Sequence, residues 1–393
     1  MKVYLDNSAT TYVSDEVLNV MLPYFKGTFG NPSSLHAYGR EAQYAVDKAR
    51  DAVANILGCK AQEIYFTSGG TESNNWAIRG AVASSKFDKK HIVTTAIEHP
   101  AVLDTCKELS KNGVNITYVG VDKSGIVSAE DIKKAVTKNT CLVTVMLANN
   151  EIGTIQPIKE IGEFCKKNGI LFHTDAVQAV NSIDLNISSL NVDMLSLSAH
   201  KFHGPKGVGV LYIKQGKNIG KILSGGAQER NKRAGTTNTP AIVGLAKALE
   251  IAVAKREEKN TRLKSLRDYF VDRVISEIPN CYLNGCTKKR LPFNANISFE
   301  FVEGESILML LDLKGIAVSS GSACASNALE PSHVIKALGV KEELAHSSIR
   351  FTLGTDTVKE ELDYTVDVLK ESIEKLRAMS PLFKQSYNKG EFV

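Results

Sequence analysis

One lysine near the middle of the chain has a sequence context that suits covalent chemistry. Lys201 lies between His200 and His203, and it follows an apolar run, Val192 to Leu197, that predicts a buried strand. A lysine near a strand end, beside groups that could hold an anion, is suited to form a Schiff base with an aldehyde. Most lysines are solvated surface charges, so this interpretation depends on what else the chain supplies.

A glycine-rich segment upstream could hold that anion. Ser68 to Asn75 follows a predicted strand, Ile64 to Thr67, and precedes a predicted helix that begins near Trp76. Glycines such as Gly70 let the backbone approach an anion, the first N–H groups of a helix lack partners, and the Thr71 hydroxyl adds a donor. The spacing matches neither the dinucleotide fingerprint nor the P-loop. For this octet alone, an ordinary glycine turn with a helix cap is the simpler explanation.

Further polar residues follow other predicted strands. Asp175 ends an apolar strand, where a carboxylate is costly to bury unless it meets a cation such as a protonated pyridine nitrogen, and Gln178 could bond a ring oxygen. His99 could stack on a planar cofactor and exchange protons near neutral pH, and Asn149 and Asn150 could contact ring substituents. Taken singly, Asp175 could equally be a strand-end cap and His99 a solvated loop residue. Because parallel strands bring their carboxyl ends to one edge of a sheet, the set together indicates a pyridoxal phosphate (PLP) site.

Cys324 differs from the other cysteines. The seven cysteines form an odd, scattered set rather than a disulfide framework, which favours a reducing, cytoplasmic setting. Cys324 lies in a run of small residues, 319–327, that we expect to be a mobile loop whose thiol could enter a pocket and leave it again. The alternative is a linker that contains a cysteine by chance. We predict no resident metal, since Cys281 and Cys286 lack the second pair of a zinc site, and Cys324 alone could act at most as a transient ligand.

Composition excludes several classes of protein. The 393 residues suggest about two or three domains, and 43% hydrophobic with 23% charged residues is ordinary for a soluble globular protein. The net charge of +5 is spread along the chain, which argues against binding to nucleic acid. No apolar run approaches the roughly 20 residues that cross a bilayer, and the first residues do not resemble a signal peptide. We therefore expect no membrane association.

Apolar runs alternate with amphipathic segments from about Glu63 to Ile213, which predicts an α/β fold with a mostly parallel sheet. The predicted strands are Ile64 to Thr67, His91 to Ala96, Ile116 to Val119, Cys141 to Leu147, Ile170 to Asp175, Met194 to Ser198 and Val208 to Ile213. A helix with Pro157 at its first position separates two of them, and a longer helix starts at Asn238 to Pro240.

The remainder of the chain has strands and helices in mixed order, which predicts a smaller α+β domain. The expected elements are a strand over Asn294 to Val302, a helix over Glu305 to Leu313, a strand over Ser347 to Leu353 and a final helix opened by a capping box, Thr357 to Glu360. The charged run Lys255 to Arg262 is either the junction between the domains or a solvated helix face.

Taken together, these motifs resemble those of the NifS/IscS-type cysteine desulfurases, fold-type I PLP enzymes of the class V aminotransferase family. The resemblance covers nearly the whole chain, and the segments that carry it are Tyr4 to Thr11, Gly30 to His36, Thr67 to Asn75, Glu98 to Pro100, Asn149 to Pro157, His173 to Ala179, Ser196 to Gly209, Gly321 to Cys324 and Arg350 to Gly354. It implies a large PLP-binding domain over 14–256, with a seven-stranded sheet, and a small domain of 1–13 and 257–393 that carries the catalytic cysteine loop. Ala227 and Thr237 depart from the glycine and glutamate usual in the family, which leaves the loop geometry near the dimer contact open.

The resemblance also implies residue roles. Lys201 would carry the cofactor, Asp175 would face its pyridine nitrogen and His99 its ring. The remaining cofactor contacts that it implies are Gln178 and Asn150 at the ring oxygen, Gly70, Thr71, Ser198 and His200 at the phosphate, and Thr236 at the phosphate of the neighbouring subunit of a homodimer. Arg350, with Asn150 beside it, would bind the substrate carboxylate; the alternative for Arg350 is a surface salt bridge.

The reaction that the resemblance implies converts L-cysteine to L-alanine. Lys201 would remove the Cα proton, His99 would donate and accept protons, and the Cys324 thiolate would take the sulfur as a persulfide. The expected partners are L-cysteine, a second copy of this chain and an iron–sulfur scaffold protein or another sulfur acceptor, among which the sequence does not choose. Two alternatives stay open: another PLP enzyme on the same scaffold, such as a small aminotransferase or a selenocysteine lyase, and a sulfur-carrier protein that uses Cys324 without catalysis.

Overall fold

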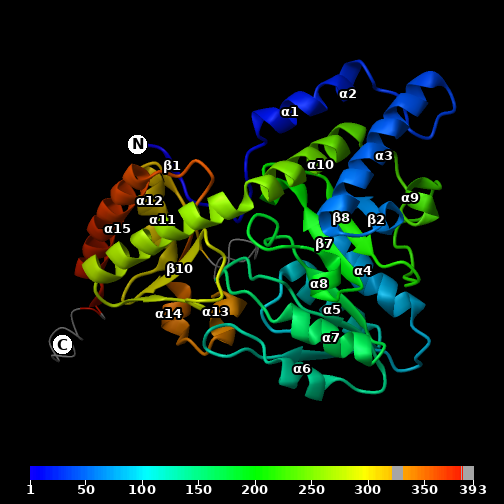
Figure 1. Cartoon of the computed structure of the whole chain (residues 1–393). Coiled ribbons are helices and arrows are strands. Elements are labelled where there is room, and N and C mark those ends of the chain that lie inside the picture. Colours follow the sequence, from blue (N-terminus) through cyan, green and yellow to red (C-terminus); the bar gives the residue numbers. More distant parts are fainter. Residues whose placement is uncertain (321–330, 382, 384–393) are drawn as a thin grey trace.

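A seven-stranded sheet forms the centre of the larger part of the molecule (Figure 1). The computed structural model describes residues 1–320, 331–381 and 383. All strands of this sheet are parallel except β8, which is antiparallel to both its neighbours. In spatial order the strands are β2 (Ile64–Thr67), β8 (Gly209–Ile213), β7 (Met194–Ser198), β6 (Leu171–Asp175), β5 (Thr140–Thr144), β3 (His91–Thr95) and β4 (Asn115–Val119). Every predicted strand is present, and the mostly parallel α/β sheet is confirmed.

Helices cover both faces of this sheet, as strands that are apolar along their whole length require. The helices on one face are α1 (Asp15–Met21), α3 (Ala37–Leu57), α7 (Ile158–Lys167), α8 (Ile187–Leu190) and α10 (Thr239–Ala254), and those on the other are α4 (Gly70–Ser84) and α5 (Pro100–Lys111). Successive residues of a strand pack on opposite faces of the sheet. In β8, Val210 and Tyr212 pack on the first face, and Leu211 and Ile213 pack on the second.

The smaller part of the molecule has its own sheet and core. Its four-stranded antiparallel sheet has the order β12 (Ser319–Ser320), β13 (Ser348–Thr352), β10 (Asn294–Phe299) and β9 (Cys281–Leu283), while β1 (Val3–Tyr4) pairs in parallel with β11 (Ile316–Ala317). The helices of this part are α11 (Arg256–Glu277), α12 (Gly304–Leu313), α13 (His333–Ala337), α14 (Glu342–His346) and α15 (Lys359–Met379). Val3 and Leu5 are buried in the same core, so the start of the chain packs with its end. We keep the division into 14–256 and 1–13 with 257–393 as a proposal.

The charged run Lys255 to Arg262 forms the first turns of α11. Helix α10 ends at Ala254 and α11 begins at Arg256, so the two helices are separated by Lys255 alone. In Figure 1, α11 extends from the end of α10 across to the smaller part of the molecule. The run therefore lies on a helix at the connection between the two parts.

Four predicted helix starts differ from the structure: α4 begins at Gly70 rather than near Trp76, α12 begins at Gly304 rather than Glu305, and α7 and α15 each begin one residue later than predicted. Pro157 is the residue before α7 rather than its first helical residue. The final helix, α15, begins after Val358, whose N–H donates to Glu361 Oε2 at 3.0 Å, so the predicted box from Thr357 to Glu360 does not form. The Thr357 hydroxyl instead accepts the N–H of Gly354 at 2.8 Å within a turn, and the helix starts one residue later. Among residues 1–320 and 331–381, no helix combines the length and the apolar character needed to cross a bilayer.

Candidate active site

Lys201 lies at the carboxyl end of β7, in a short 3-10 turn, Ala199–Lys201. Its Nζ donates to the carbonyl oxygens of Ser8 and Ala9, at 2.6 and 2.7 Å. Asn181 Nδ2 donates to the Lys201 carbonyl at 2.8 Å, which fixes the backbone of the lysine as well. The N-terminal segment thus reaches across from the smaller part of the molecule and meets the amine.

Asp175 ends the neighbouring strand, β6, and its carboxylate is buried and fully oriented. Its Oδ2 accepts from Asn74 Nδ2 at 2.6 Å, and its Oδ1 accepts from the N–H of Val177 at 2.9 Å. Asn74 lies in the second turn of α4, and its other amide atom, Oδ1, is buried without a hydrogen-bond partner among the described residues. Sequence reasoning gave Asn74 no role. Its position one turn after Gly70, at the edge where the strands end, was the available signal.

The start of α4 has the features of an anion site. The helix begins at Gly70 without a side-chain cap, after Gly69 with φ of 151°. A Cβ atom at Gly70 would lie only 2.8 Å from Val177 Cγ2, so a side chain would fill this space, and Ser198 lies beside the same two glycines. Uncapped N–H groups at a helix start attract a phosphate.

The other predicted phosphate contacts lie in different environments. His200 Nδ1 is 3.1 Å from Thr10 Oγ1, and burial together with the charges of Lys201 and Lys206 lowers the pKa of His200 to about 4. Thr71 is exposed on the first turn of α4, and Thr236 is exposed in the loop before α10. Their phosphate roles stay predictions.

His99 caps the next helix along the edge. Its Nδ1 accepts the N–H of Ala101 at 3.1 Å, at the start of α5. Burial lowers the pKa of His99, while the charge of Asp175 raises it and that of Lys201 lowers it further, so these groups lie within electrostatic reach of one ring. A neutral ring whose Nδ1 accepts must carry its proton on Nε2.

Gln178 and Asn150, the two residues predicted to contact the ring oxygen, follow strands β6 and β5. Gln178 Nε2 donates to the Ser8 carbonyl at 3.0 Å, so Ser8 receives both this amide and Lys201. The Asn149 side chain is used within the protein, since its Nδ2 donates to the Ile97 carbonyl in the His99 loop and its Oδ1 accepts the N–H groups of Glu151 and Ile152, while Asn150 is half-buried. Of the two asparagines, Asn150 is therefore the one placed to meet a ligand.

Arg350, on β13, is only 3% exposed. Its Nη2 donates to Asp6 Oδ1 at 2.8 Å and its Nη1 to the carbonyl of Asn150 at 3.1 Å, while its Nε is buried without a partner among the described residues. Arg350 does form a salt bridge, but with a buried guanidinium and a 19% exposed Asp6 side chain rather than on the surface, and its substrate role stays a prediction. Ser8 Oγ is likewise buried without a partner in the described chain. Together with Asn74 Oδ1, these atoms leave hydrogen-bonding capacity for a polar ligand, and the donor set fits PLP.

Cys324 lies outside the described residues. The described chain on either side ends close to the site: Ser319 is paired with Arg350 across β12 and β13, and Ser332 donates to Glu151 next to Asn150. Within the described residues, no group of His, Cys, Asp and Glu side chains could hold a metal ion.

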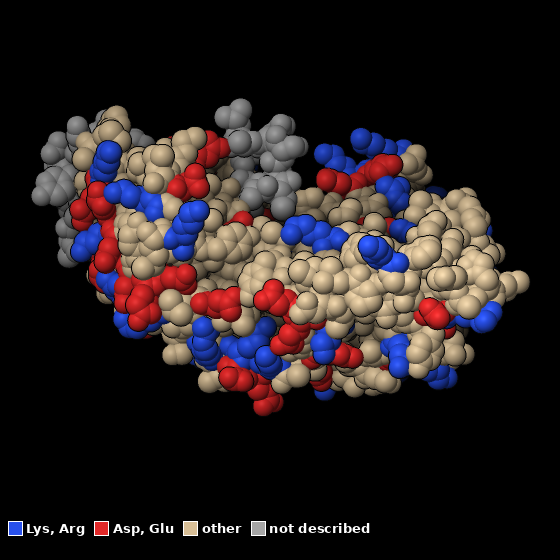
Figure 2. Space-filling model, turned by 90° about the horizontal axis from the view of Figure 1, so that it is seen from above, with Lys and Arg blue, Asp and Glu red and all other residues tan. Residues whose placement is uncertain are grey.

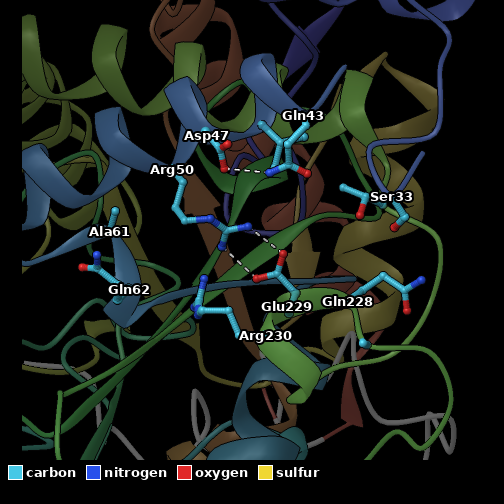
Figure 3. Close-up of a pocket in the computed structure, with 12 residues that line it drawn as sticks. Ser33, Gln43, Asp47, Arg50, Ala61, Gln62, Gln228, Glu229 and Arg230 are labelled. Atoms are coloured by element: carbon cyan, nitrogen blue, oxygen red, sulfur yellow. Dashed lines mark hydrogen bonds and ion pairs between the residues drawn. The ribbon is translucent and has the colours of Figure 1, made fainter. Parts of the chain in front are cut away.

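The two positions where the chain departs from the family pattern share a pocket of about 550 Å³ (Figure 3). Ala227 and Thr237 line it together with Arg50, whose guanidinium pairs with both carboxylate oxygens of Glu229 at 2.7 and 2.8 Å. Glu229 also accepts the N–H of Phe66 on β2 at 3.0 Å. This pair anchors a loop whose Glu229 has φ of 46°, and the same loop leads to Thr236.

Comparison with known proteins identifies the family. Residues 3–365 match the model of the class-V aminotransferases. A cysteine desulfurase IscS of Dictyoglomus turgidum is 54% identical over 386 residues, which cover 98% of each chain. The chain belongs to the cysteine desulfurases of this family.

Solved structures agree with this assignment. The cysteine desulfurase fold described above superimposes on a NifS-like protein with a TM-score of 0.90 and 40% identity, covering 95% of this chain and 100% of the other. A structure titled SspA in complex with cysteine matches with a TM-score of 0.80 and 36% identity, covering 91% of this chain and 100% of that one. The predicted family, the fold-type I architecture and the enzyme class are confirmed.

Proposed function

We propose that this chain holds PLP at the edge formed by β6 and β7 and converts L-cysteine to L-alanine, with the sulfur passing to Cys324. The observation that carries the proposal is the buried Asp175 carboxylate, which Asn74 and Val177 orient and whose charge, like that of Lys201, acts on the His99 ring. A relative named cysteine desulfurase IscS supports the activity, and a similar structure described as a complex with cysteine supports the substrate.

The residues that would hold the cofactor are those the sequence predicts. Lys201 would join it, Asp175 would pair with its ring nitrogen, and His99 would lie on its ring. The other contacts would be Gln178 and Asn150 at the ring oxygen and Gly70, Thr71, Ser198 and His200 at the phosphate. When bound, PLP supplies an electron-poor ring that stabilises negative charge on the amino acid attached to it.

The chain itself would bind the substrate and move its protons. The guanidinium of Arg350, fixed by Asp6 and the Asn150 carbonyl, would hold the substrate carboxylate. The amine of Lys201 would take the Cα proton. Its hydrogen bonds to the carbonyls of Ser8 and Ala9 position this amine at the end of β7. His99 would exchange protons through Nε2, because its Nδ1 is occupied by Ala101.

Sulfur transfer would then use the thiolate of Cys324. Its Sγ attacks the Sγ of the substrate, an S–S bond forms, and the Cβ–Sγ bond of the substrate breaks. The electron pair of that bond remains on Cβ, which takes up a proton to give the methyl group of alanine. The product on the protein is a persulfide, in which the transferred sulfur is open to attack by a second thiol.

A homodimer is supported by the surface of the N-terminal helices. Large apolar side chains are exposed on and between α1, α2 (Pro23–Lys26) and α3, among them Phe25 at 62%, Phe29 at 64% and Leu35 at 92%. Figure 2 shows a broad area with few charged residues over this part of the molecule. Exposed apolar patches of this kind mark protein interfaces, and in such a dimer Thr236 would reach the phosphate of the neighbouring subunit.

The sulfur acceptor would be an iron–sulfur scaffold protein or another thiol-bearing protein in the cytoplasm. The name IscS of several relatives and the scattered cysteines, which are free in the described part of the chain, support this setting.

Incubation of the PLP-loaded protein with L-cysteine tests the proposed reaction. Alanine should form, and mass spectrometry should find one added sulfur atom on Cys324. Cys324→Ala should bind PLP normally but form no persulfide and release no sulfide in the presence of a thiol, whereas Cys59→Ala, which removes a partly accessible thiol elsewhere in the chain, should behave as the wild type. Normal turnover by Cys324→Ala would instead favour another PLP enzyme on this scaffold.

A further inference from the structure

Ser332, the N-cap of α13, and His333, its first residue, contact the neighbours of two proposed site residues. The Ser332 hydroxyl donates to Glu151 Oε2 at 2.5 Å, and Glu151 directly follows Asn150. The Nε2 of His333 is 2.9 Å from the carbonyl oxygen of Glu98, which directly precedes His99. These two contacts lie on different loops of the large sheet.

Apolar packing holds α13 against the same two loops. Val334, Ile335 and Leu338 form one buried cluster with Ile97, Met146 and Ile152. Ile97 lies two residues before His99, and Ile152 lies two residues after Asn150. A helix of five residues is not stable alone, so α13 and the loops must stabilise one another.

The Ser332 hydroxyl is buried and makes three hydrogen bonds, whereas the contact of His333 with Glu98 is part-buried. Ser332 donates to Glu151 and accepts the N–H groups of Val334 and Ile335 at 3.1 and 3.2 Å. Burial raises the pKa of Glu151 to about 7, against the opposing effects of Ser332 and of the Arg350 charge. Loss of the hydroxyl would leave a buried carboxyl oxygen without its donor, which is costly.

Each of these two contacts supports a residue with a different proposed role in the reaction. Glu151 directly follows Asn150, whose carbonyl accepts a hydrogen bond from Arg350 at 3.1 Å. Through Glu151, Ser332 therefore supports the arginine that would bind the substrate carboxylate. Glu98 directly precedes His99, so the contact of His333 with the Glu98 carbonyl supports the His99 ring, which would exchange protons. Glu98 is itself fixed, because its Oε1 accepts from Thr95 Oγ1 and from the N–H of Met146.

We infer that Ser332 and His333 are positioning residues of this active site: Ser332 fixes the Asn150 loop through Glu151, and His333 fixes the His99 loop through the Glu98 carbonyl. Neither side chain needs to touch the substrate. This inference rests on the proposed roles of His99, Asn150 and Arg350. Two adjacent residues would then support substrate binding and proton transfer.

The test compares His333→Leu, which removes the donor, with His333→Gln, which keeps an N–H at similar reach. Carbon-13 labelling of the eight histidines allows the titration of His99 to be followed by NMR in the holoenzyme, with the His99→Gln variant identifying its signal. The charged and titratable groups that act on this ring are Asp175, Lys201, His333 and Asp104. His333→Leu should raise the titration midpoint of His99, because water reaches a loosened ring, and should lower kcat by about 10- to 100-fold. His333→Gln should restore most of both.

Ser332→Ala should mainly raise KM for L-cysteine, by roughly tenfold, and Ser332→Thr should restore it. The matched control is Ser128→Ala, which removes the same kind of helix cap, a side chain that accepts from Asp131 N–H at 3.2 Å, from the exposed start of α6 (Ala129–Ala135). An unchanged His99 titration in His333→Leu, or equal kinetic losses in Ser128→Ala, would overturn the inference. A wild type that forms no alanine would overturn the proposed function instead, and the titration of His99 can be read without turnover.

Discussion

Arg350 Nη2 lies 2.8 Å from Oδ1 of Asp6, a residue 344 positions earlier in the sequence. The pair joins the N-terminal segment to β13, and the same segment contacts the amine of Lys201 through Ser8 and Ala9. One short stretch at the start of the chain therefore orients both the proposed substrate-binding cation and the proposed cofactor-binding amine.

Arg350→Lys should raise KM for L-cysteine by about 10- to 100-fold and change kcat less. A lysine keeps the charge but cannot offer two parallel N–H donors to a carboxylate or bridge Asp6 and Asn150. Steady-state kinetics measure the effect. The matched control is Arg377→Lys, because Arg377 is also a buried arginine, at 4% exposure, but it bonds only backbone carbonyls of the smaller part. Similar values of KM for both variants would contradict the role of Arg350.

Asn74→Ala should weaken PLP binding by roughly tenfold or more. The substitution removes the 2.6 Å hydrogen bond to Asp175 and leaves one oxygen of a buried carboxylate without its donor. Fluorescence titration of the apoprotein with PLP measures the affinity. Asn75→Ala is the control on the same helix, since Asn75 contacts Thr71 and Thr105 rather than Asp175. Equal affinity of wild type and Asn74→Ala would show that Asn74 does not support the carboxylate.

Glu98→Gln should become progressively more stable than the wild type as the pH rises. Burial raises the pKa of Glu98 from 4.5 to about 8, so within this window the folded chain holds a proton that the unfolded chain has released. The free energy of unfolding of the wild type therefore falls as the pH increases from 4.5 to 8. Glutamine does not titrate. The buried histidines with lowered pKa are present in both proteins, so their contributions to the free energy of unfolding cancel in the difference. Denaturant unfolding at several pH values gives the difference, and a difference that is constant with pH would contradict a neutral Glu98.

The double variant Phe25→Asp/Leu35→Asp should be a monomer, whereas the wild type should sediment as a dimer. Two charges in an apolar interface must be desolvated on association, which disfavours the dimer. Leu313→Asp places the same charge on an 80% exposed leucine of α12 and should leave the dimer intact. A monomeric wild type, or a double variant that remains dimeric, would contradict the proposed interface.

The sheet could be predicted because its strands are short apolar runs with clear ends. The prediction was too long where burial continues beyond the ladder: Val145 and Leu147 are buried and still bond β6, although β5 ends at Thr144. The final helix was placed one residue early because the Thr357 hydroxyl serves a turn rather than a cap.

The residue types that carry chemistry could also be predicted, but their supports could not. Lys201 and Ser8 are 193 positions apart, and Asn74 and Asp175 are 101 apart, so no local spacing relates them. The contacts of Ser332 and His333 with the loops of Asn150 and His99 are equally remote in sequence. Only the folded chain shows which polar side chains orient the site.

The most direct test of the central claim is to find the residue that carries the cofactor. The PLP-loaded protein is reduced with borohydride, digested, and its peptides are mapped by mass spectrometry. A pyridoxyl label should appear on Lys201, and none should appear in Lys201→Ala. A label on another lysine, or no label on the wild type, would contradict the claim.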